Sequence, residues 1–482
     1  MKRKMKYSFG SALCLVLTIV LLSLSLYGCD ENDIPSITET AETTESPVTT
    51  QSPLVTDPTV EHTFDQEQMN KFLALVDYGK LLQVQEIFET LYIGEYKPYS
   101  EIGTEVIKAI AETIDLEEIT TVDEATTAFI DAYLHEMGDK YAYYYDAKAY
   151  EEYSDDVSGE YAGIGVSVTM TESRYIEVLN VFSESPADKV GILPGDILVE
   201  VDGEDIVELG YYKAIDMVRG EIGTSVNLTI DREGERISFD VIRDKVTEIT
   251  VEYEMKENDI GYIRITSFDA KTYVQFVEAY TALEEQGAKG LVFDVRNNPG
   301  GTLDAVVAIL EYILPDGPIV HMEYKNSANN YTISSVEDCS PFFRYFNKYY
   351  ENHEIKLPMV VLANQNTASA GELFTSSLND YDAATVIGVK TYGKGVGQRG
   401  VSLTDENDEP DGSVVTITYF YYAPPYSENY DGIGIEPDIL SELSEEAQNK
   451  NLYKLTDEED TQLQDGIEEI LRMIRVMSAI GN

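Results

Sequence analysis

From Gly261 onward, short apolar runs alternate with segments whose apolar residues recur at helical spacing. Strands are predicted for GYIRITSF, GLVFDVRN, PMVVLANQ and ATVIGVK, and helices for VQFVEAYTALEEQ, LDAVVAILEYIL and the segment from Gly371. Strands that alternate with helices are typical of a largely parallel sheet covered by helices. We therefore predict that residues 245–441 form an α/β domain.

The flanking segments differ, and 482 residues are too many for a single hydrophobic core. Residues 64–156 contain few Gly or Pro and repeat apolar residues at helical spacing, which predicts a helical N-terminal domain. Residues 157–244 alternate apolar runs with turns such as Pro194-Gly195, which predicts a compact β-rich domain. Residues 442–482 predict a helical tail. The expected fold class is multidomain α/β, with the β-rich domain inserted between the N-terminal helices and the α/β core.

The first 28 residues resemble a bacterial lipoprotein signal peptide. Four cations lie among the first six residues, an apolar run follows from Ala12 to Leu26, and Leu26-Tyr27-Gly28-Cys29 resembles a lipobox. The resemblance implies that Cys29 is lipidated and anchors the chain to the outer face of the bacterial cell membrane. The alternative is an uncleaved membrane helix, because the apolar run is nearly long enough to span a bilayer.

The amino-acid composition limits the kinds of molecule that the chain is expected to bind. Residues 29–63 are rich in Thr, Ser, Pro and Glu, so they cannot bury a core and predict a disordered tether. The net charge of −54 excludes nucleic acid and disfavours a basic membrane-binding patch, so attachment is expected to come from the lipid. With Cys14 in the signal peptide and Cys29 lipidated, Cys339 is left as a free thiol.

Common hydrolase motifs are missing. The sequence contains neither G-x-S-x-G nor H-E-x-x-H, and its four histidines (His62, His135, His321 and His353) stand in contexts that suggest no catalytic role. A hydrolase of this sequence needs another base, and lysine serves when burial favours its neutral form. No metal ion or other cofactor is expected.

Ser369 is the strongest candidate nucleophile from local sequence. It follows the predicted strand MVVLANQ and lies among small residues at the start of a predicted helix. The first N–H groups of a helix have no intrahelical partner, so a hydroxyl at this turn lies where an oxyanion can be stabilised. An N–H of Ala370 and one from the glycine-containing turn at 298–301 could bind that oxyanion.

Four segments, in order, resemble the carboxy-terminal processing proteases, a family of Ser-Lys peptidases with an embedded PDZ domain. They are DVRNNPGG (294–301), TASAGELF (367–374), KTYGKGVGQ (390–398) and GIGIEPDI (432–439). The resemblance implies that Ser369 is the nucleophile and Lys394 its general base. It also implies that Gln398, one helical turn beyond the lysine, orients Lys394, and that an oxyanion hole forms from Gly300, Gly301 and Ala370.

Asp380 is a weaker candidate for a supporting role, because an acid beside the lysine would favour the charged form of the base.

Residues 157–244 resemble a PDZ domain in YAGIG (161–165) and SPADKVGILPGDILVEVDG (185–203). The resemblance implies a loop that binds the C-terminal carboxylate of a peptide docked as an added strand. The implied substrate-binding residues are Tyr161, Ala162, Gly163, Ile164 and Gly165. The expected partners are therefore proteins or peptides with exposed C-termini.

Two other function classes stay open. The chain could be a catalytically silent peptide-binding scaffold, or a ligand-binding relative with the same core fold. The presence of Ser369, Lys394 and Gln398 favours a serine endopeptidase over both. Helices outside the core could also pair two chains into a homodimer.

Overall fold

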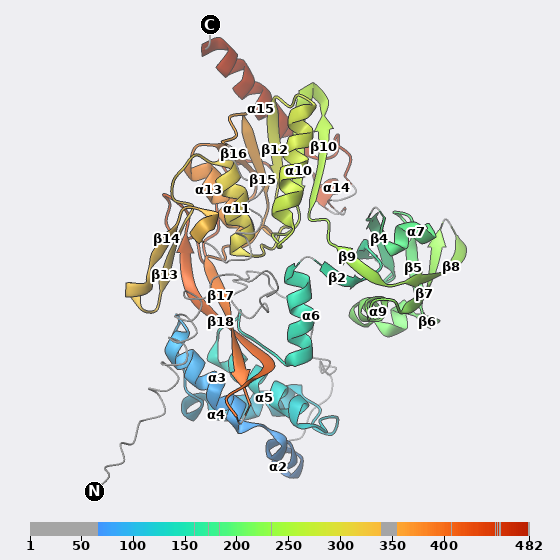
Figure 1. The fold of residues 1–482 in the computed structure, drawn as a ribbon, viewed down its shortest axis with the longest axis vertical. Helices are drawn as coiled ribbons and strands as arrows, with labels where there is room; N and C mark the ends of the chain where they lie inside the picture. The colour runs from blue at the N-terminus through green and yellow to red at the C-terminus, as the bar shows by residue number, and fades with distance from the viewer. Residues whose placement is uncertain are drawn as a thin grey trace, which may run out of the picture. The chain divides into compact units, whose positions relative to one another are not determined.

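The computed structural model describes residues 66–480 with gaps, and residues 481–482 are not described; Figure 1 shows its fold. The gaps are residues 159, 172, 183, 233, 339–353, 406, 449, 451 and 453–454. The predicted signal peptide, the lipid acceptor Cys29, the predicted tether and Cys339 all lie outside the described residues. Within the described part, no helix combines the length and the apolar character needed to cross a bilayer.

The central sheet has the strand order β10-β11-β12-β15-β16-β19, in which all neighbours are parallel except the antiparallel pair β10 and β11. Its strands are β10 (Val251–Lys256), β11 (Ile260–Ile265), β12 (Gly290–Asp294), β15 (Met359–Ala363), β16 (Ala384–Gly388) and β19 (Ile439–Leu440). The expected largely parallel sheet is confirmed.

Helices cover both faces of this sheet, because successive side chains of a strand point to opposite faces. Leu291, Phe293 and Val361 pack with α10 (Thr272–Glu285), α11 (Leu303–Ile313) and α13 (Ala370–Asp380) in the largest core. Val292 and Val360 point the other way, against Leu463 and Ile470 of α15 (Thr461–Ile480). The predicted C-terminal helix is therefore present, after the short α14 (Glu445–Gln448), and it completes the core.

A buried ion cluster fastens α15 to the end of β12. The Arg296 guanidinium donates to the Asp294 carboxylate over 2.6 Å and to the Asp460 carboxylate over 2.7 Å, and all three side chains are nearly inaccessible. Burial alone raises the pKa of Asp294, but the charge and hydrogen bonds of Arg296 hold that pKa at about 2. The turn that follows β12 is thus held by charge as well as by packing.

A second sheet was not anticipated. It runs β1-β18-β13-β14, and β17 pairs with β18 as well. Its strands are β1 (Tyr143–Tyr145), β13 (Val320–Tyr324), β14 (Tyr331–Ile333), β17 (Val396–Thr404) and β18 (Pro410–Ala423). The strand β18 pairs with β1 through Tyr143 and Thr416, which are 273 residues apart. Such long-range pairing leaves no local signal in the sequence.

The predicted N-terminal helices are present. They are α2 (Gln66–Leu75), α3 (Tyr78–Leu91), α4 (Tyr99–Thr113), α5 (Val122–Met137) and α6 (Ala147–Ser158). The helix α5 begins at a capping box between Thr121 and Glu124 and ends at Gly138, whose φ of 92° suits glycine. The apolar core of these helices also contains Leu403 of β17 and Val415 of β18, so the helices pack directly on the second sheet.

The β-rich region has a core of its own. Its sheet runs β3-β4-β5-β7-β8, with β6 paired to β5, and β2 pairs with β9. The strands are β2 (Glu160–Gly163), β3 (Val166–Met170), β4 (Ile176–Val181), β5 (Ile197–Val201), β6 (Glu204–Asp205), β7 (Ser225–Arg232), β8 (Glu235–Ile242) and β9 (Asp244–Thr247). Its helices are α7 (Pro186–Val190), α8 (Ile206–Leu209) and α9 (Tyr211–Val218). Short 3-10 helices elsewhere are η1 (Glu257–Asp259), η2 (Ser327–Asn329) and η3 (Val336–Asp338).

Candidate active site

The segments with family-like sequence gather at one edge of the central sheet. The strands β12 and β15 are parallel neighbours, so the chain leaves both at the same edge. After these strands, the Ala368 N–H donates to the Asn298 carbonyl over 2.9 Å. The lysine segment joins the 432–439 segment through the Thr391 N–H, which donates to the Ile435 carbonyl over 3.1 Å. Residues far apart in the sequence therefore meet here.

Ser369 is fully buried at the N-terminus of α13, in a strained conformation. Its φ of 56° and ψ of −118° are unusual for a residue with a side chain, and such strain costs on the order of 1–3 kcal/mol. The Ser369 N–H donates to the Glu372 carboxylate over 2.9 Å. The Ser369 carbonyl accepts from the Leu373 N–H over 2.8 Å and from the Tyr430 hydroxyl over 3.4 Å. The surrounding bonds thus fix the strained residue.

The Ser369 hydroxyl is bonded to a tyrosine. Its Oγ lies 3.2 Å from the hydroxyl oxygen of Tyr422, which itself donates to the Lys394 carbonyl over 2.7 Å. A tyrosine hydroxyl has one proton, and the carbonyl can only accept it. Ser369 is therefore the donor to Tyr422. Among the described residues Ser369 Oγ has no hydrogen bond to the Lys394 ammonium, so the nucleophile and its predicted base are neighbours with different partners.

Lys394 is buried, with a side chain only 1% exposed. Its Nζ lies 4.4 Å from the ring centroid of Tyr141, in a cation–π contact. The Lys394 N–H donates to the Glu372 carboxylate over 2.8 Å. The backbone of the predicted base is thus held at both its N–H and its carbonyl.

Glu372 is a buried carboxylate that joins the nucleophile segment to the lysine segment. It accepts hydrogen bonds from the N–H groups of Ser369, Lys394 and Gly393 and from the Thr391 hydroxyl, at 2.9, 2.8, 2.7 and 2.5 Å. Burial raises the pKa of Glu372, and these bonds oppose the rise. Sequence reasoning missed Glu372, although Ser369-x-x-Glu372 is a capping-box pattern that could have revealed it.

Gln398 lies near the site, but not as predicted. The prediction that it follows Lys394 by one helical turn is wrong, because β17 begins at Val396 and Gln398 pairs with Thr418 of β18 beside a β-bulge. Its side chain is buried, and neither polar atom of its amide has a hydrogen-bond partner in the described structure. An unpaired buried amide lowers the stability of the fold by about 1–3 kcal/mol, so such a group usually has a role that explains its presence.

The predicted oxyanion residues lie beside the nucleophile. Ala370 is the first residue of α13, where helix N–H groups have no intrahelical partner. Gly300 has a φ of 118°, and its N–H donates to the Asn298 side chain over 2.8 Å. Gly301 has a φ of 137°, and a Cβ there would lie 2.2 Å from the Phe268 carbonyl oxygen. Only glycine fits at 301, so the close approach of this turn is built into the sequence.

Asp380 is engaged elsewhere. Its carboxylate accepts from the N–H groups of Tyr426 and Ser427 over 2.7 and 2.8 Å, and it also bonds to the Ser427 hydroxyl. Asp380 therefore fixes the loop after β18, which is a structural role.

The predicted carboxylate-binding residues form a strand followed by a turn. Tyr161, Ala162 and Gly163 belong to β2 and pair with β9, so much of their backbone bonding capacity is already used. Ile164 is buried, and Gly165, with a φ of 78°, turns the chain into β3. A Cβ at Gly165 would lie 2.4 Å from Ser185 Cβ, so glycine is required. The turn before the edge strand β3 is the part of this segment closest to the predicted role.

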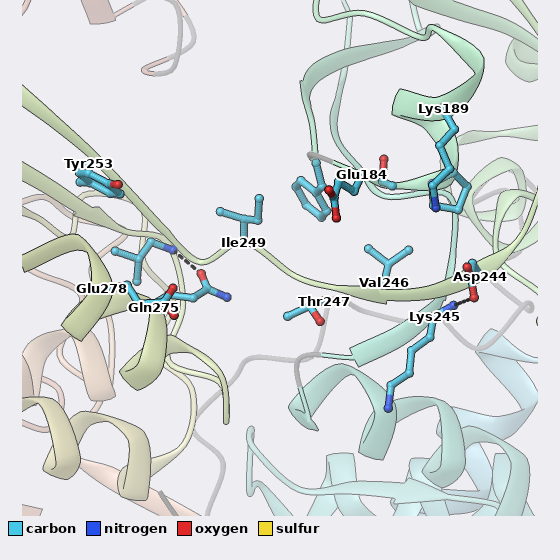
Figure 2. A pocket seen from close by; sticks show the side chains of 14 residues that line it. Glu184, Lys189, Asp244, Lys245, Val246, Thr247, Ile249, Tyr253, Gln275 and Glu278 are labelled. Atoms are coloured by element: carbon cyan, nitrogen blue, oxygen red, sulfur yellow. Dashed lines mark hydrogen bonds between the residues drawn. The ribbon is translucent and has the colours of Figure 1, made fainter. Parts of the chain in front are cut away.

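A pocket of about 450 Å³ lies along the linker between β9 and β10, and Figure 2 shows the side chains that line it. The Gln275 side chain accepts from the N–H groups of Thr250 and Val251 over 2.9 and 3.1 Å, which holds the linker against α10. None of the predicted catalytic residues lines this pocket. The pocket is therefore separate from the buried cluster around Ser369.

Comparison with known proteins shows the family of the chain. Residues 259–441 match peptidase family S41, and residues 162–242 match a PDZ domain. The carboxy-terminal processing protease CtpA of Bacillus subtilis is 30% identical over 335 residues, covering 69% of this chain and 67% of that protein. A probable CtpA-like serine protease of Staphylococcus saprophyticus is 31% identical over 334 residues, covering 69% of this chain and 64% of that protein.

The chain thus spans about two thirds of the length of these relatives. Among solved structures, a photosystem II D1 C-terminal processing protease is similar, with 22% identity, a TM-score of 0.42, and coverage of 78% of this chain and 94% of that one. The family assignment rests on the sequence relatives and confirms the resemblance seen in the motifs. The chain belongs to peptidase family S41, among the CtpA-like serine proteases that carry a PDZ domain.

Proposed function

We propose that the protein is a serine endopeptidase in which Ser369 is the nucleophile and Lys394 the general base. The observation that carries the proposal is the shared anchoring of the two residues. One carboxylate, Glu372, accepts from both backbone N–H groups, and one hydroxyl, Tyr422, links Ser369 Oγ to the Lys394 carbonyl. Fixed proximity of nucleophile and base is what covalent catalysis requires.

The reaction begins with a change of partners. Lys394 leaves the Tyr141 ring as the neutral amine, and the Ser369 hydroxyl turns from Tyr422 towards it. Lys394 takes the hydroxyl proton while Oγ attacks the scissile carbonyl, and it then gives that proton to the leaving amine. Gln398 supplies the amide that orients the lysine in this state. Water releases the acyl group by the same steps.

The negative oxygen of the tetrahedral intermediate would be stabilised by the N–H of Ala370 and by an N–H of the turn at Gly300 and Gly301. The Gly300 N–H donates to the Asn298 side chain at rest, so it would have to leave that acceptor to take part. The buried setting of these N–H groups strengthens such bonds relative to water, and loss of one donor costs roughly 10²–10³ in rate. The buried Asp294–Arg296 pair fixes the start of this turn.

Substrates are proposed to be proteins held by their C-termini. Relatives are named carboxy-terminal processing proteases, and the matched PDZ domain has β3 at the edge of its sheet in the described structure. An extended peptide could add to that edge, with its carboxylate at the Ile164–Gly165 turn. A substrate with a free C-terminus should then show a higher kcat/KM than the same peptide amidated, and equal values would contradict C-terminal recognition.

The proposed location is the outer face of a bacterial cell membrane, with a lipid on Cys29. The support is the lipobox-like sequence followed by a polar tether. Labelling cells with a lipid precursor should mark the wild-type protein but not the Cys29→Ser variant. An unlabelled mature chain that begins well after Cys29 would refute the anchor.

Catalysis is tested with full-length protein in detergent. Ser369→Ala and Lys394→Ala should each reduce peptide cleavage by about 10⁶-fold, the loss seen when a serine nucleophile is removed. Matched controls are Ser376→Ala, in the same helix, and Lys390→Ala, whose exposed ammonium pairs with Glu436. Both controls should cleave normally. Substantial turnover by well-folded Ser369→Ala or Lys394→Ala would end the assignment.

A further inference from the structure

One aromatic ring lies beneath two ammonium groups at the site. Lys394 Nζ is 4.4 Å from the ring centroid of Tyr141, and Lys140 Nζ is 4.6 Å from the same centroid. The two nitrogens are therefore separated by no more than the sum of these distances. Lys394 is buried whereas Lys140 is exposed, so the ring contacts both the predicted base and a second cation at the surface.

Tyr141 is delivered to the site by the N-terminal helices. It lies in the turn between α5 and β1, and its N–H donates to the Asp139 carboxylate over 3.1 Å. The same carboxylate accepts from the N–H and the hydroxyl of Thr418 on β18, over 2.9 and 2.8 Å. The buried Asp139 thus fixes Tyr141 relative to the strand that pairs with Gln398. These hydrogen bonds hold the backbone of Tyr141 in a fixed position beside β18.

The Tyr141 ring acts as a neutral π face. Burial raises the pKa of its hydroxyl above the ordinary value, so the ring stays protonated at working pH. Tyr392 contributes to that rise, yet the buried hydroxyl has no hydrogen bond within the described residues. A cation over such a ring is favoured over the neutral amine by about 0.5–2 kcal/mol, depending on desolvation.

Other charges also face Lys394. Asp139 is close enough for its own pKa, raised by burial, to be lowered by the lysine, and it favours the ammonium in return. Glu372 accepts from the backbone N–H of Lys394, and Asp431 accepts from the N–H of Gly395. These carboxylates favour the charged lysine, whereas Lys140 opposes it. Lys140 is the cation that shares the Tyr141 ring with the base in the described part of the chain.

We propose that the Tyr141 ring is the resting place of the protonated Lys394 and that Tyr141 and Lys140 together set the pH at which the base becomes active. The proposal rests on the proposed function of Lys394. It makes Tyr141 a positioning residue contributed by the N-terminal helical region, so that the active site is complete only when that region is packed on β18. Leaving the ring is then part of each activation of the base.

The experiment is the pH dependence of kcat/KM for the full-length protein, which reports groups that titrate in the free enzyme. The acidic limb of this profile is the pH range in which kcat/KM rises as Lys394 loses its proton. Replacing Tyr141 by leucine removes the π face that favours the ammonium, so the acidic limb should move about 0.5–1 pH unit lower. Tyr141→Phe keeps the face and removes a hydroxyl that has no partner, so its limb should stay in place. A purely structural role of Tyr141 would lower activity without moving the limb.

Two further variants keep the proposal testable if the leucine variant fails to fold. A trifluorinated phenylalanine at position 141 keeps the ring volume and weakens its π face, so the limb should again move lower. Lys140→Met removes the opposing cation and should move the limb higher by a few tenths of a pH unit at low salt, with no shift in 1 M salt.

The proposal is overturned if folded Tyr141→Leu or the fluorinated variant keeps the wild-type limb, or if Lys140→Met leaves it unmoved at low salt. These outcomes are distinct from failure of the proposed function. If Lys394→Ala retained full cleavage, the lysine would not be the base at all, whatever the limb of the Tyr141 variants did.

Discussion

The proposed nucleophile Ser369 and the proposed base Lys394 are held in contrasting ways. Every described contact of Ser369, from its N–H to its hydroxyl, is a hydrogen bond to a buried group. Lys394 has an equally well-held backbone, but its ammonium lies on the Tyr141 ring, and the amide of Gln398 has no partner. The difference teaches that the Ser369 hydroxyl is held by a directional hydrogen bond, whereas the Lys394 ammonium also contacts the face of an aromatic ring.

The largest effect is expected at Glu372, the carboxylate that accepts hydrogen bonds from the backbone of both Ser369 and Lys394. Glu372→Ala leaves four buried donors without their acceptor, two from the base segment's backbone alone. We expect kcat/KM to fall by at least about 10³-fold and the free energy of unfolding to fall by about 3–5 kcal/mol. Activity and denaturant unfolding of the purified protein measure both.

The matched control for this variant is Ser376→Ala in the same helix, whose hydroxyl bonds only to the helix carbonyl of Leu373. It should change stability by about 1 kcal/mol or less. If Glu372→Ala kept wild-type kcat/KM, the two halves of the site would not depend on a common anchor.

The next effect separates activity from stability. Because the Gln398 amide has no partner at rest, Gln398→Met should raise the free energy of unfolding by about 1 kcal/mol. The same change should lower kcat by about 10–100-fold, since the amide is needed once Lys394 moves.

Gln462 provides the contrasting control, because its buried amide donates to the Ser441 carbonyl and accepts from Arg296. Gln462→Met should lower stability by about 1–3 kcal/mol. A loss of stability in Gln398→Met as large as in Gln462→Met would mean that Gln398 already has a partner at rest.

A smaller effect is expected at the tyrosine between the two halves. Tyr422→Phe removes the hydroxyl that holds Ser369 Oγ and the Lys394 carbonyl, so kcat should fall about 5–10-fold with little change in KM. Tyr430→Phe removes a hydroxyl that lies next to Tyr422 and makes a long, 3.4 Å bond to the Ser369 carbonyl, so it should have the weaker effect. The reverse ranking in steady-state kinetics would show that the bridge is incidental.

The smallest effect concerns the helices that support the base. Burial raises the pKa of Asp131 in α5 to about 7, above its value of about 3.9 in an unfolded chain. A carboxyl whose pKa is raised by folding destabilises the folded state when it ionises. This loss of stability is absent below pH 4 and complete above pH 7. Asp131→Asn should therefore raise the unfolding free energy at pH 8 by about 1–2 kcal/mol, since the side chain keeps some exposure to water.

At pH 4 the same variant should gain nothing, and cleavage should be unaffected at either pH. Asp123→Asn, exposed in the first turn of the same helix, serves as the control and should show no such gain at pH 8. An equal gain for Asp131→Asn at both values of pH would exclude titration of this carboxyl as the cause.

Much of this architecture could be predicted from sequence. The period of the apolar residues was enough for the parallel sheet and the helices, and the family-like motifs were enough to single out Ser369 and Lys394 as candidates. The second sheet could not be predicted, because β1 and β18 pair across 273 residues without a local signal. The roles of Tyr141 and Tyr422 at the site could not be predicted for the same reason. Only tertiary packing brings their side chains to Lys394 and Ser369. The expectation that Gln398 lies one helical turn beyond Lys394 was wrong because the chain enters the strand β17 at Val396.

The pairing of β1 with β18 also has a consequence for biosynthesis. The ring beneath the base comes from an early part of the chain, while the strand that receives it is made more than 250 residues later. Contacts this distant form late in folding, after long loops have closed. A partly synthesised chain that ends before β18 therefore holds Ser369 without the Tyr141 ring fixed beside Lys394. The proposed site can be complete only once β18 has been made and has paired with β1.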